Sequence, residues 1–191
     1  MSGAKRRASP GARGAAGRLT HVSPEGHAHM VDVGEKPETS RSAIAEARVT
    51  ISPELERAIR EDRVKKGSVL EVARIAGIQA AKRTSELIPL CHPLALDAVE
   101  LSLQLEPRTV VVEARVRCRG RTGVEMEALT AVSVAALTVV DMGKAIDREM
   151  TIHGVLLREK HGGRSGDFVR GAGAHAAGAA SGGARPRARR R

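Results

Sequence analysis

The residues best suited to chemistry in this sequence are charged groups at the two ends of one long apolar segment. The segment runs from residue 120 to 147, with Glu125 and Glu127 near its start and Asp141 and Lys144 near its end. A helix this apolar must be largely buried, and a buried charge costs free energy unless it is paired or its pKa shifts until it is neutral. The sequence therefore predicts partners for these groups, which is typical of a catalytic site.

The spacing of these groups limits how they can act together. Asp141 and Lys144 are three residues apart, so on a helix their side chains lie within reach of each other. They form either an ordinary surface ion pair or, in a cleft, a tuned acid–base pair. Glu127 and Asp141 return to nearly the same helix face, but an unbroken helix separates them by about 21 Å. If both ends are functional, we expect a site shared between subunits.

A histidine held in a rigid turn is a second candidate. His92 follows Cys91 and lies between Pro89 and Pro93. Because each proline fixes one φ angle, His92 would be held in place at little entropic cost. Such a histidine suits substrate binding or proton transfer, and it equally suits a structural role in a tight turn.

Two basic segments could bind phosphate. In KHGGRSG, from Lys160 to Gly166, paired glycines would let backbone amides approach a phosphate while Lys160 and Arg164 supply charge. The segment lacks the spacing of a Walker A loop, and it could instead be a flexible loop. Lys66, before Gly67, is equally consistent with the basic end of a helix.

Hydrophobic periodicity predicts the elements that position these groups. After an irregular arm over 27–38, alternation predicts a strand over 43–51. Ser52 and Pro53 begin a short helix, and Ser68 with Glu71 forms a capping box for a second helix that ends before Pro89. A hairpin over 98–117 turns at 107–108, and a long helix near 124–146 precedes a strand over 151–159. This order predicts an α+β fold with helices on one face of a mostly antiparallel sheet.

The net charge of +10 belongs to the two ends of the chain. Residues 1–18 carry +5 and residues 169–191 carry +6, which leaves −1 for residues 19–168. We interpret 1–18 and 169–191 as disordered basic tails and 19–168 as one catalytic domain. The tails could attract nucleic acid or a membrane surface weakly, or they could simply be solvated. The single aromatic residue, Phe168, argues against a base-stacking module.

The composition also bears on location. The basic N-terminus is not followed by the apolar stretch of a signal peptide. The run from Val124 to Val140 contains Glu and other polar residues, so we expect it to fall short of a membrane span. Cys91 and Cys118 are too few for a disulfide framework. These features predict a cytoplasmic protein with no membrane partner and no specific nucleic-acid partner.

Four long motifs together resemble one family. The strings LTHVSPEGHAHMVDVGEK, ARIAGIQAAKRTSELIPLCHPL, TGVEMEALTAVSVAALTVVDMGKAID and EKHGGRSGDF follow one another in the order and spacing of the MoaC family. The resemblance covers residues 19–168. It implies a lyase of molybdenum cofactor biosynthesis that converts (8S)-3′,8-cyclo-7,8-dihydroguanosine 5′-triphosphate to cyclic pyranopterin monophosphate and diphosphate.

The resemblance also implies an architecture. It is a ferredoxin-like two-layer α+β sandwich, assembled as a homohexamer, a trimer of dimers, with active sites at subunit interfaces. No resident cofactor or protein metal ligands are implied, and a Mg²⁺ ion at the triphosphate is left open. Two alternatives are a non-catalytic nucleotide-binding relative and a protein that associates with nucleic acid through its tails.

By motif match, the resemblance assigns roles to residues. Asp141 falls on the catalytic aspartate and Lys144 on the catalytic lysine. The expected substrate-binding residues are Leu90, Cys91, His92, Met126, Glu127, Lys66 and Lys160, and the residues expected around them are Asp32, Arg41, Arg74, Lys82, Arg83, Glu125 and Arg164. The chain departs from the common pattern at Gly143, where many relatives have Cys, and at His161 and Arg164, which replace Ser and Lys.

Overall fold

The computed structural model of the 191-residue chain describes residues 26–171. Of the two units into which the chain divides, residues 1–31 and 32–191, the first is described only for residues 26–31, where all but Val31 are exposed. The expectations for residues 1–18 and 172–191, and the expected domain start at residue 19, lie outside the described residues. The fold below is that of residues 32–171.

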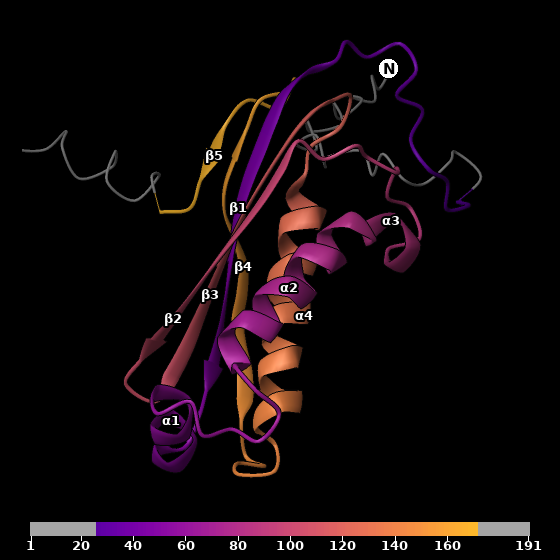
Figure 1. Cartoon of the computed structure of the whole chain (residues 1–191). Coiled ribbons are helices and arrows are strands. Elements are labelled where there is room, and N and C mark those ends of the chain that lie inside the picture. Colours follow the sequence, from indigo (N-terminus) through magenta and orange to yellow (C-terminus); the bar gives the residue numbers. More distant parts are fainter. Residues whose placement is uncertain (1–25, 172–191) are drawn as a thin grey trace, which may run out of the picture. The chain divides into compact units, whose positions relative to one another are not determined.

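The sheet has five strands, all paired antiparallel in the order β2-β3-β1-β4-β5 (Figure 1). The strands are β1 (Thr39–Thr50), β2 (Ala98–Glu106), β3 (Thr109–Gly120), β4 (Thr151–His161) and β5 (Phe168–Val169). The predicted strands over 43–51, 98–117 and 151–159 are confirmed. The short β5 was not predicted, and it spans the expected boundary between residues 168 and 169. Residues 32–38 form a turn and no regular element, as expected.

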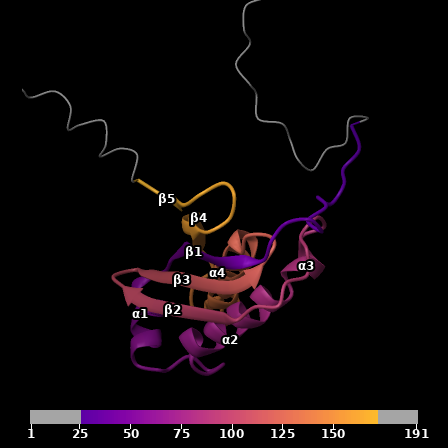
Figure 2. The ribbon, with the colours of Figure 1, turned by 90° about the horizontal axis from the view of Figure 1, so that it is seen from above.

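Two of the helices cover one face of this sheet. α2 (Val69–Lys82) and α4 (Glu125–Gly143) pack against each other and against the strands, and Figure 2 shows them on the same side of the sheet. α1 (Pro53–Arg60) and α3 (Thr84–Leu87) are short. The β-α-β-β-α-β order with this strand order is the ferredoxin-like arrangement, so the predicted α+β sandwich is confirmed.

The helix ends agree with the predicted signals only in part. Ser52 caps α1 by accepting a hydrogen bond from the Leu55 amide at 3.2 Å. Ser68 stands at the start of α2 but makes no side-chain cap, so the predicted capping box is wrong. Its partner carboxylate, Glu71, instead pairs with Arg74 one turn along the helix. α2 ends at Lys82, before Pro89 as predicted, and the separate short α3 follows it; the long helix ends at Gly143 rather than at 146.

Small side chains bring the two covering helices close together. A Cβ atom at Gly77 of α2 would lie 2.9 Å from the backbone oxygen of Ala131 in α4, so no larger residue fits there. On the sheet side, α4 packs its alanines and valines against fully buried residues of β1 and β3 such as Ala45 and Val112. This packing holds α4 in place as one continuous helix, with charged residues at its two ends.

By length and composition alone, α4 could cross a membrane, so the expectation that this run falls short was wrong on that criterion. In the fold, 56% of its most apolar window is buried against the other elements. A core helix passes the same test because burial in protein demands the same composition as burial in lipid.

Candidate active site

At the C-terminal end of α4, one carboxylate lies between two lysines. The Lys144 ammonium lies 2.7 Å from Oδ1 of Asp141, and Lys66 Nζ lies 2.9 Å from Oδ2. Lys66 also donates to the backbone oxygen of Asp141 at 2.7 Å. The contact between Asp141 and Lys144 expected from their spacing is present. The third member comes from the loop between α1 and α2, and neighbouring residues of that loop and of α4 border a cavity of about 280 Å³.

The two lysines fix the charge state of Asp141. Hydrogen bonds from Lys144 and then Lys66 lower the pKa of Asp141 from 3.8 to about 2. The carboxylate is therefore ionised throughout the neutral range. All three side chains are about half exposed, so a ligand in the adjoining cavity could reach them.

At the N-terminal end of α4, a second carboxyl has the opposite environment. The Glu127 side chain is buried, with 4% of the residue exposed, and burial followed by the charge of Glu125 raises its pKa to about 7. Cys91 and Cys118 lie near enough for the Glu127 charge to add to the effect of burial in raising their thiol pKa values. The predicted substrate-binding turn at 90–92 and the start of α4 are thus brought together, with Leu90 and His92 half-buried and Met126 exposed.

The Gly-rich loop lies at this same end of the sheet. Lys160 of β4 pairs with Ala43 of β1, whose side chain faces the helices, so Lys160 projects on the helix side. Arg41, two residues earlier in β1, pairs with Cys118 and donates to the backbone oxygens of Gly120 and Arg121, both at 3.4 Å. Two cations therefore lie at the end of the sheet where α4 begins.

The loop itself packs tightly on Arg41. A side chain at Gly163 would clash with the Arg41 guanidinium, and one at Gly162 would clash with the backbone oxygen of Ser40. Both glycines have positive φ angles, of 86° and 88° respectively. Gly162 is required for close packing on the backbone of β1, and the positive φ angles of both glycines favour glycine in the turn. Arg164 is exposed in the same loop.

Four of the residues expected around the site have other positions. Arg74 pairs with Glu71 and donates to the backbone oxygen of Leu101, which ties α2 to β2. Arg83 pairs with Glu86 at 2.9 Å on the surface, and Asp32 accepts a hydrogen bond from the Gly34 amide at 2.8 Å. Lys82 borders a cavity of about 440 Å³ between α2 and residues 94–99. Within the described residues, the bonds that Arg74, Arg83 and Asp32 make go to residues outside α4.

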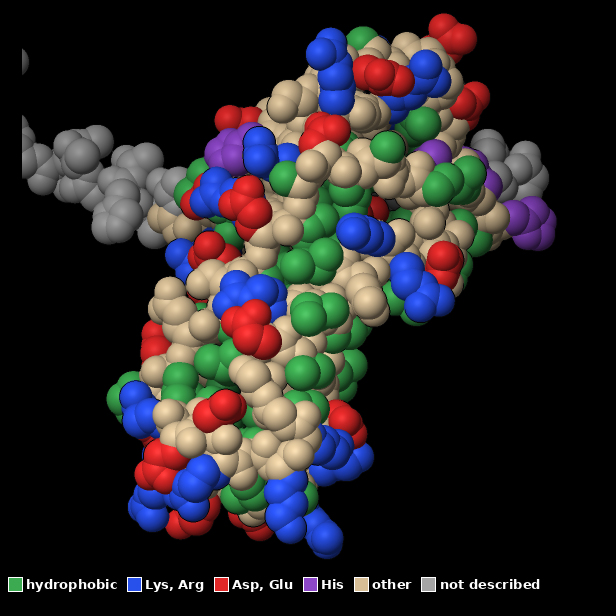
Figure 3. Space-filling view, viewed as in Figure 1, with side chains coloured by type: hydrophobic (Ala, Val, Ile, Leu, Met, Phe, Trp, Pro, Cys, Tyr) green, Lys and Arg blue, Asp and Glu red, His purple; other side chains and the backbone are tan. Residues whose placement is uncertain are grey.

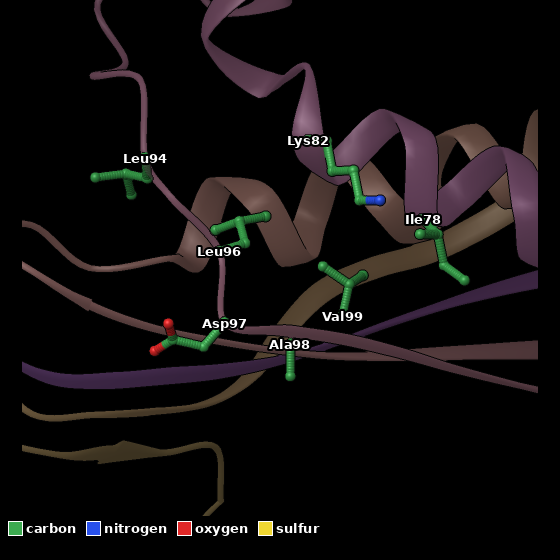
Figure 4. A pocket seen from close by; sticks show the side chains of 7 residues that line it. All are labelled: Ile78, Lys82, Leu94, Leu96, Asp97, Ala98 and Val99. Carbon is green, nitrogen blue, oxygen red and sulfur yellow. The ribbon is translucent and has the colours of Figure 1, made fainter.

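The cavity beside Lys82 differs chemically from the two charged ends. Figure 4 shows that Lys82 and Asp97 supply charge to a lining that is otherwise apolar, with side chains such as Leu96 and Val99. Its size exceeds that of the cavity near Asp141, but no pair of charged groups is held together in it. The charged groups that the fold holds together lie instead at the two ends of α4.

Comparison with known proteins shows the family of this chain. Residues 30–163 match the model of the MoaC family. The chain belongs to the MoaC family. It is 59% identical over 156 residues to the cyclic pyranopterin monophosphate synthase of Parvibaculum lavamentivorans, a match that covers 81% of this chain and 98% of the relative. The proteins of the same name from Thermomicrobium roseum and Chloroflexus aurantiacus are 59% and 54% identical over 154 residues, covering 80% of this chain and 93% and 94% of the relatives.

The segment shared with the MoaC family contains nearly every residue expected at the site. Asp32 to Lys160 lie inside it, and Arg164 lies one residue beyond its end. Within the described residues of this MoaC chain, no group of three or more His, Cys, Asp and Glu side chains is arranged to hold a metal ion.

Sequence reasoning missed two features of this MoaC site. It placed Lys66 and Asp141 at the site by resemblance but did not predict that they contact each other. It also gave His161 no partner, whereas the ring contacts carboxylates on both sides.

The helix layer of the MoaC chain leaves apolar side chains exposed. Val72 and Ile75 of α2 and Leu137 of α4 are 39%, 57% and 58% exposed. In the view of Figure 3, hydrophobic side chains lie exposed along the middle of this face, with charged side chains among them and toward both ends.

Proposed function

We propose that this chain is a cyclic pyranopterin monophosphate synthase. It is a lyase that converts (8S)-3′,8-cyclo-7,8-dihydroguanosine 5′-triphosphate to cyclic pyranopterin monophosphate and diphosphate in molybdenum cofactor biosynthesis. One observation carries the proposal: Asp141 is held between Lys66 and Lys144 in a chain 59% identical to a relative of that name.

The lysine–aspartate pair serves proton transfer. Rebuilding a purine-derived ring into a pterin requires proton transfers to nitrogen and oxygen atoms. Lys144 has protons to donate, and the ionised Asp141 carboxylate orients its ammonium at 2.7 Å. We assign Lys144 as the principal proton donor and Asp141 as its partner.

The basic residues serve the triphosphate. In the lyase step a substrate hydroxyl oxygen attacks the phosphorus nearest the ribose, its proton passes to a base, and the bond to the leaving diphosphate breaks. Charge accumulates on that diphosphate, so cations that contact it stabilise the transition state. Lys66, at the Asp141 end of α4, and Lys160, with Arg41 near it at the Glu127 end, are suited to this role. A Mg²⁺ ion would take most of its ligands from the phosphates and water, which requires few protein carboxylates.

The other end of α4 suits the ring of the substrate. A carboxyl with a pKa of about 7 exchanges protons readily at neutral pH, and Glu127 is held at the base of a turn that carries Cys91 and His92. Met126 adds an apolar contact surface beside it. We assign this end to binding the heterocycle.

A complete site requires two subunits in this scheme. A ligand the size of one nucleotide cannot span about 21 Å along a helix to meet both ends. A homohexamer built as a trimer of dimers would bring the Asp141 end of one subunit to the Glu127 end of another. The exposed apolar side chains on α2 and α4 support burial of this layer between subunits. We place the assembly in the cytoplasm.

The direct test is incubation of the purified full chain with the cyclised GTP substrate. Diphosphate and the pterin product should form together, in equal amounts. Substrate binding without either product would identify a non-catalytic relative. Retention on nucleic acid at moderate salt, lost on deletion of 1–18 and 169–191, would favour the tail-mediated alternative.

A further inference from the structure

His161, at the end of β4, lies between two carboxylates. Its Nε2 is 3.2 Å from Oε2 of Glu159, and its Nδ1 is 3.1 Å from Oδ2 of Asp167. A neutral imidazole has one donor nitrogen and one acceptor nitrogen, whereas an imidazolium donates from both. The two contacts can therefore be hydrogen bonds at the same time only if His161 is protonated.

Asp167 in turn closes the Gly-rich turn, which we define as residues 162–167. Its Oδ1 accepts a hydrogen bond from the Gly162 amide at 3.0 Å, while its Oδ2 faces His161. The Gly166 amide bonds the oxygen of Gly163 at 3.2 Å across the turn. Because Asp167 is largely exposed, its position depends on these few polar contacts.

The Gly-rich turn positions two cations assigned to the phosphates. Lys160 directly precedes His161, and its ammonium bonds the Ser165 hydroxyl inside the turn. Arg41 packs against Gly163, where a side chain would clash with the guanidinium. A turn that opens would release both contacts at once.

We propose that His161 is a positioning residue: as an imidazolium bridging Glu159 and Asp167, it locks the Gly-rich turn and so holds Lys160 and Arg41 for the substrate phosphates. This proposal depends on the proposed function only for the identity of the ligand, the substrate phosphates. The ring itself projects on the face away from Lys160, since His161 pairs with Ser42 rather than with inward-facing Ala43, and it does not touch the substrate.

The surrounding charges make the lock sensitive to pH. The hydrogen bond to Asp167, and then the one to Glu159, raises the pKa of His161 above 6.5. The imidazolium is present below 6.5 and is lost as pH rises through the raised pKa of His161, so the lock weakens above that pKa. Charged residues near His161 in the sheet register include Lys160 on β4, Arg41 on β1, Arg115, Arg117 and Arg119 on β3, Arg164 in the turn and Arg170 after β5.

Three variants of the full chain test this lock. His161→Ser removes the bridge, and His161→Arg keeps donors and positive charge at every accessible pH. His153→Ser is the matched control, since His153 is also in β4 but bonds Thr50 at 2.9 Å near the other end of the strand. The readouts are KM and kcat for the cyclised substrate, and amide hydrogen exchange of residues 159–170, at about pH 6.5 and at a pH above the raised pKa of His161, as located by titration of its ring.

We expect KM of the wild type to rise several-fold between the two pH values with kcat nearly unchanged. At both pH values, His161→Ser should have a KM and an amide exchange rate about tenfold above those of the wild type at about pH 6.5. His161→Arg should keep the low wild-type KM at both pH values. The proposal would be overturned if His161→Ser had the same KM and amide exchange as the wild type. It would also be overturned if His153→Ser changed KM and exchange as much as His161→Ser does. Exchange protection of β1 reports whether each variant is folded. If the wild type turns over no substrate, the proposed function fails, but the exchange comparison still decides the role of His161.

Discussion

Glu127 and Asp141 lie on one unbroken helix, about 21 Å apart, and their surroundings shift the pKa values of their carboxyl groups in opposite directions. Burial raises the pKa of Glu127 to about 7, whereas two lysines lower that of Asp141 to about 2. Near neutral pH one carboxyl can exchange a proton and the other is a fixed anion. The carboxyl that exchanges a proton is therefore at the N-terminal end of α4, and the fixed anion is at its C-terminal end.

Loss of the Lys144 ammonium should abolish most turnover. We expect Lys144→Gln to lower kcat by about 10²- to 10⁴-fold, because general acid catalysis contributes that much. KM should change little, since Lys66 still supplies charge at Asp141. Diphosphate release at saturating substrate measures this.

A matched control separates chemistry from loss of an ion pair. Arg60→Gln removes a surface pair of similar geometry, 2.9 Å from Glu56 within α1, and should leave kcat within about twofold of the wild type. Near-native turnover in Lys144→Gln would rule out its assignment as the proton donor.

Loss of Lys160 should act on binding instead. Lys160→Ala removes a cation assigned to the phosphates, so KM should rise about tenfold or more with a smaller fall in kcat. Lys66→Ala should combine a higher KM with a lower kcat, because Lys66 also contacts Asp141 at 2.9 Å. Steady-state kinetics at several salt concentrations would show this split, and Arg57→Ala on α1 provides a surface-charge control. An unchanged KM in Lys160→Ala would exclude it from the phosphate site.

Subunit mixing tests the shared site. Glu127→Ala and Asp141→Ala homo-oligomers should each be nearly inactive. After dissociation and joint reassembly, sites that pair an intact Asp141 end with an intact Glu127 end should regain about a quarter of wild-type activity if subunits mix at random and each site takes its two ends from different subunits. Mixing either variant with itself is the control. If no activity returns although mass analysis shows mixed oligomers, both ends must act within one chain.

The fold was largely predictable because its signals are local and periodic. Alternation in β1 and the Pro107–Arg108 turn identified the strands, and Ser52 identified a real cap. The capping box predicted at Ser68 does not form, because Glu71 pairs instead with Arg74, three residues along the same helix. The two-residue β5 has too little sequence to show alternation and forms only because Phe168 and Val169 pair with β4.

The site was predictable where its residues are close in sequence. Asp141 and Lys144 share a helix face, so their contact follows from spacing. Lys66 reaches the same carboxylate from another loop, and only the packing of that loop against α4 brings them together. Periodicity likewise gave no reason to separate Arg74, which ties α2 to β2, from the lysines at the site.

The buried carboxyl of Glu127 should make stability depend on pH. Its pKa is about 7 in the folded chain against 4.5 for an unperturbed glutamate, so between these values the folded state binds more protons than the unfolded state. The free energy of unfolding should therefore fall as pH rises from 4.5 to 7 and level off above. The full effect is on the order of 3 kcal/mol per subunit.

Glu127→Gln isolates this contribution, because the amide has the same shape and does not ionise. At about pH 8 the variant should be more stable than the wild type by up to about 3 kcal/mol, and near pH 4.5 the two should be equal. Urea unfolding at one fixed protein concentration measures this, since subunit association also contributes to stability. Glu149→Gln, which changes an exposed carboxyl in the loop after α4, should show no such difference in stability between the two pH values. Parallel stability curves for the wild type and Glu127→Gln would mean that Glu127 is ionised in the fold, and its assignment as a proton-exchanging group at neutral pH would fail with them.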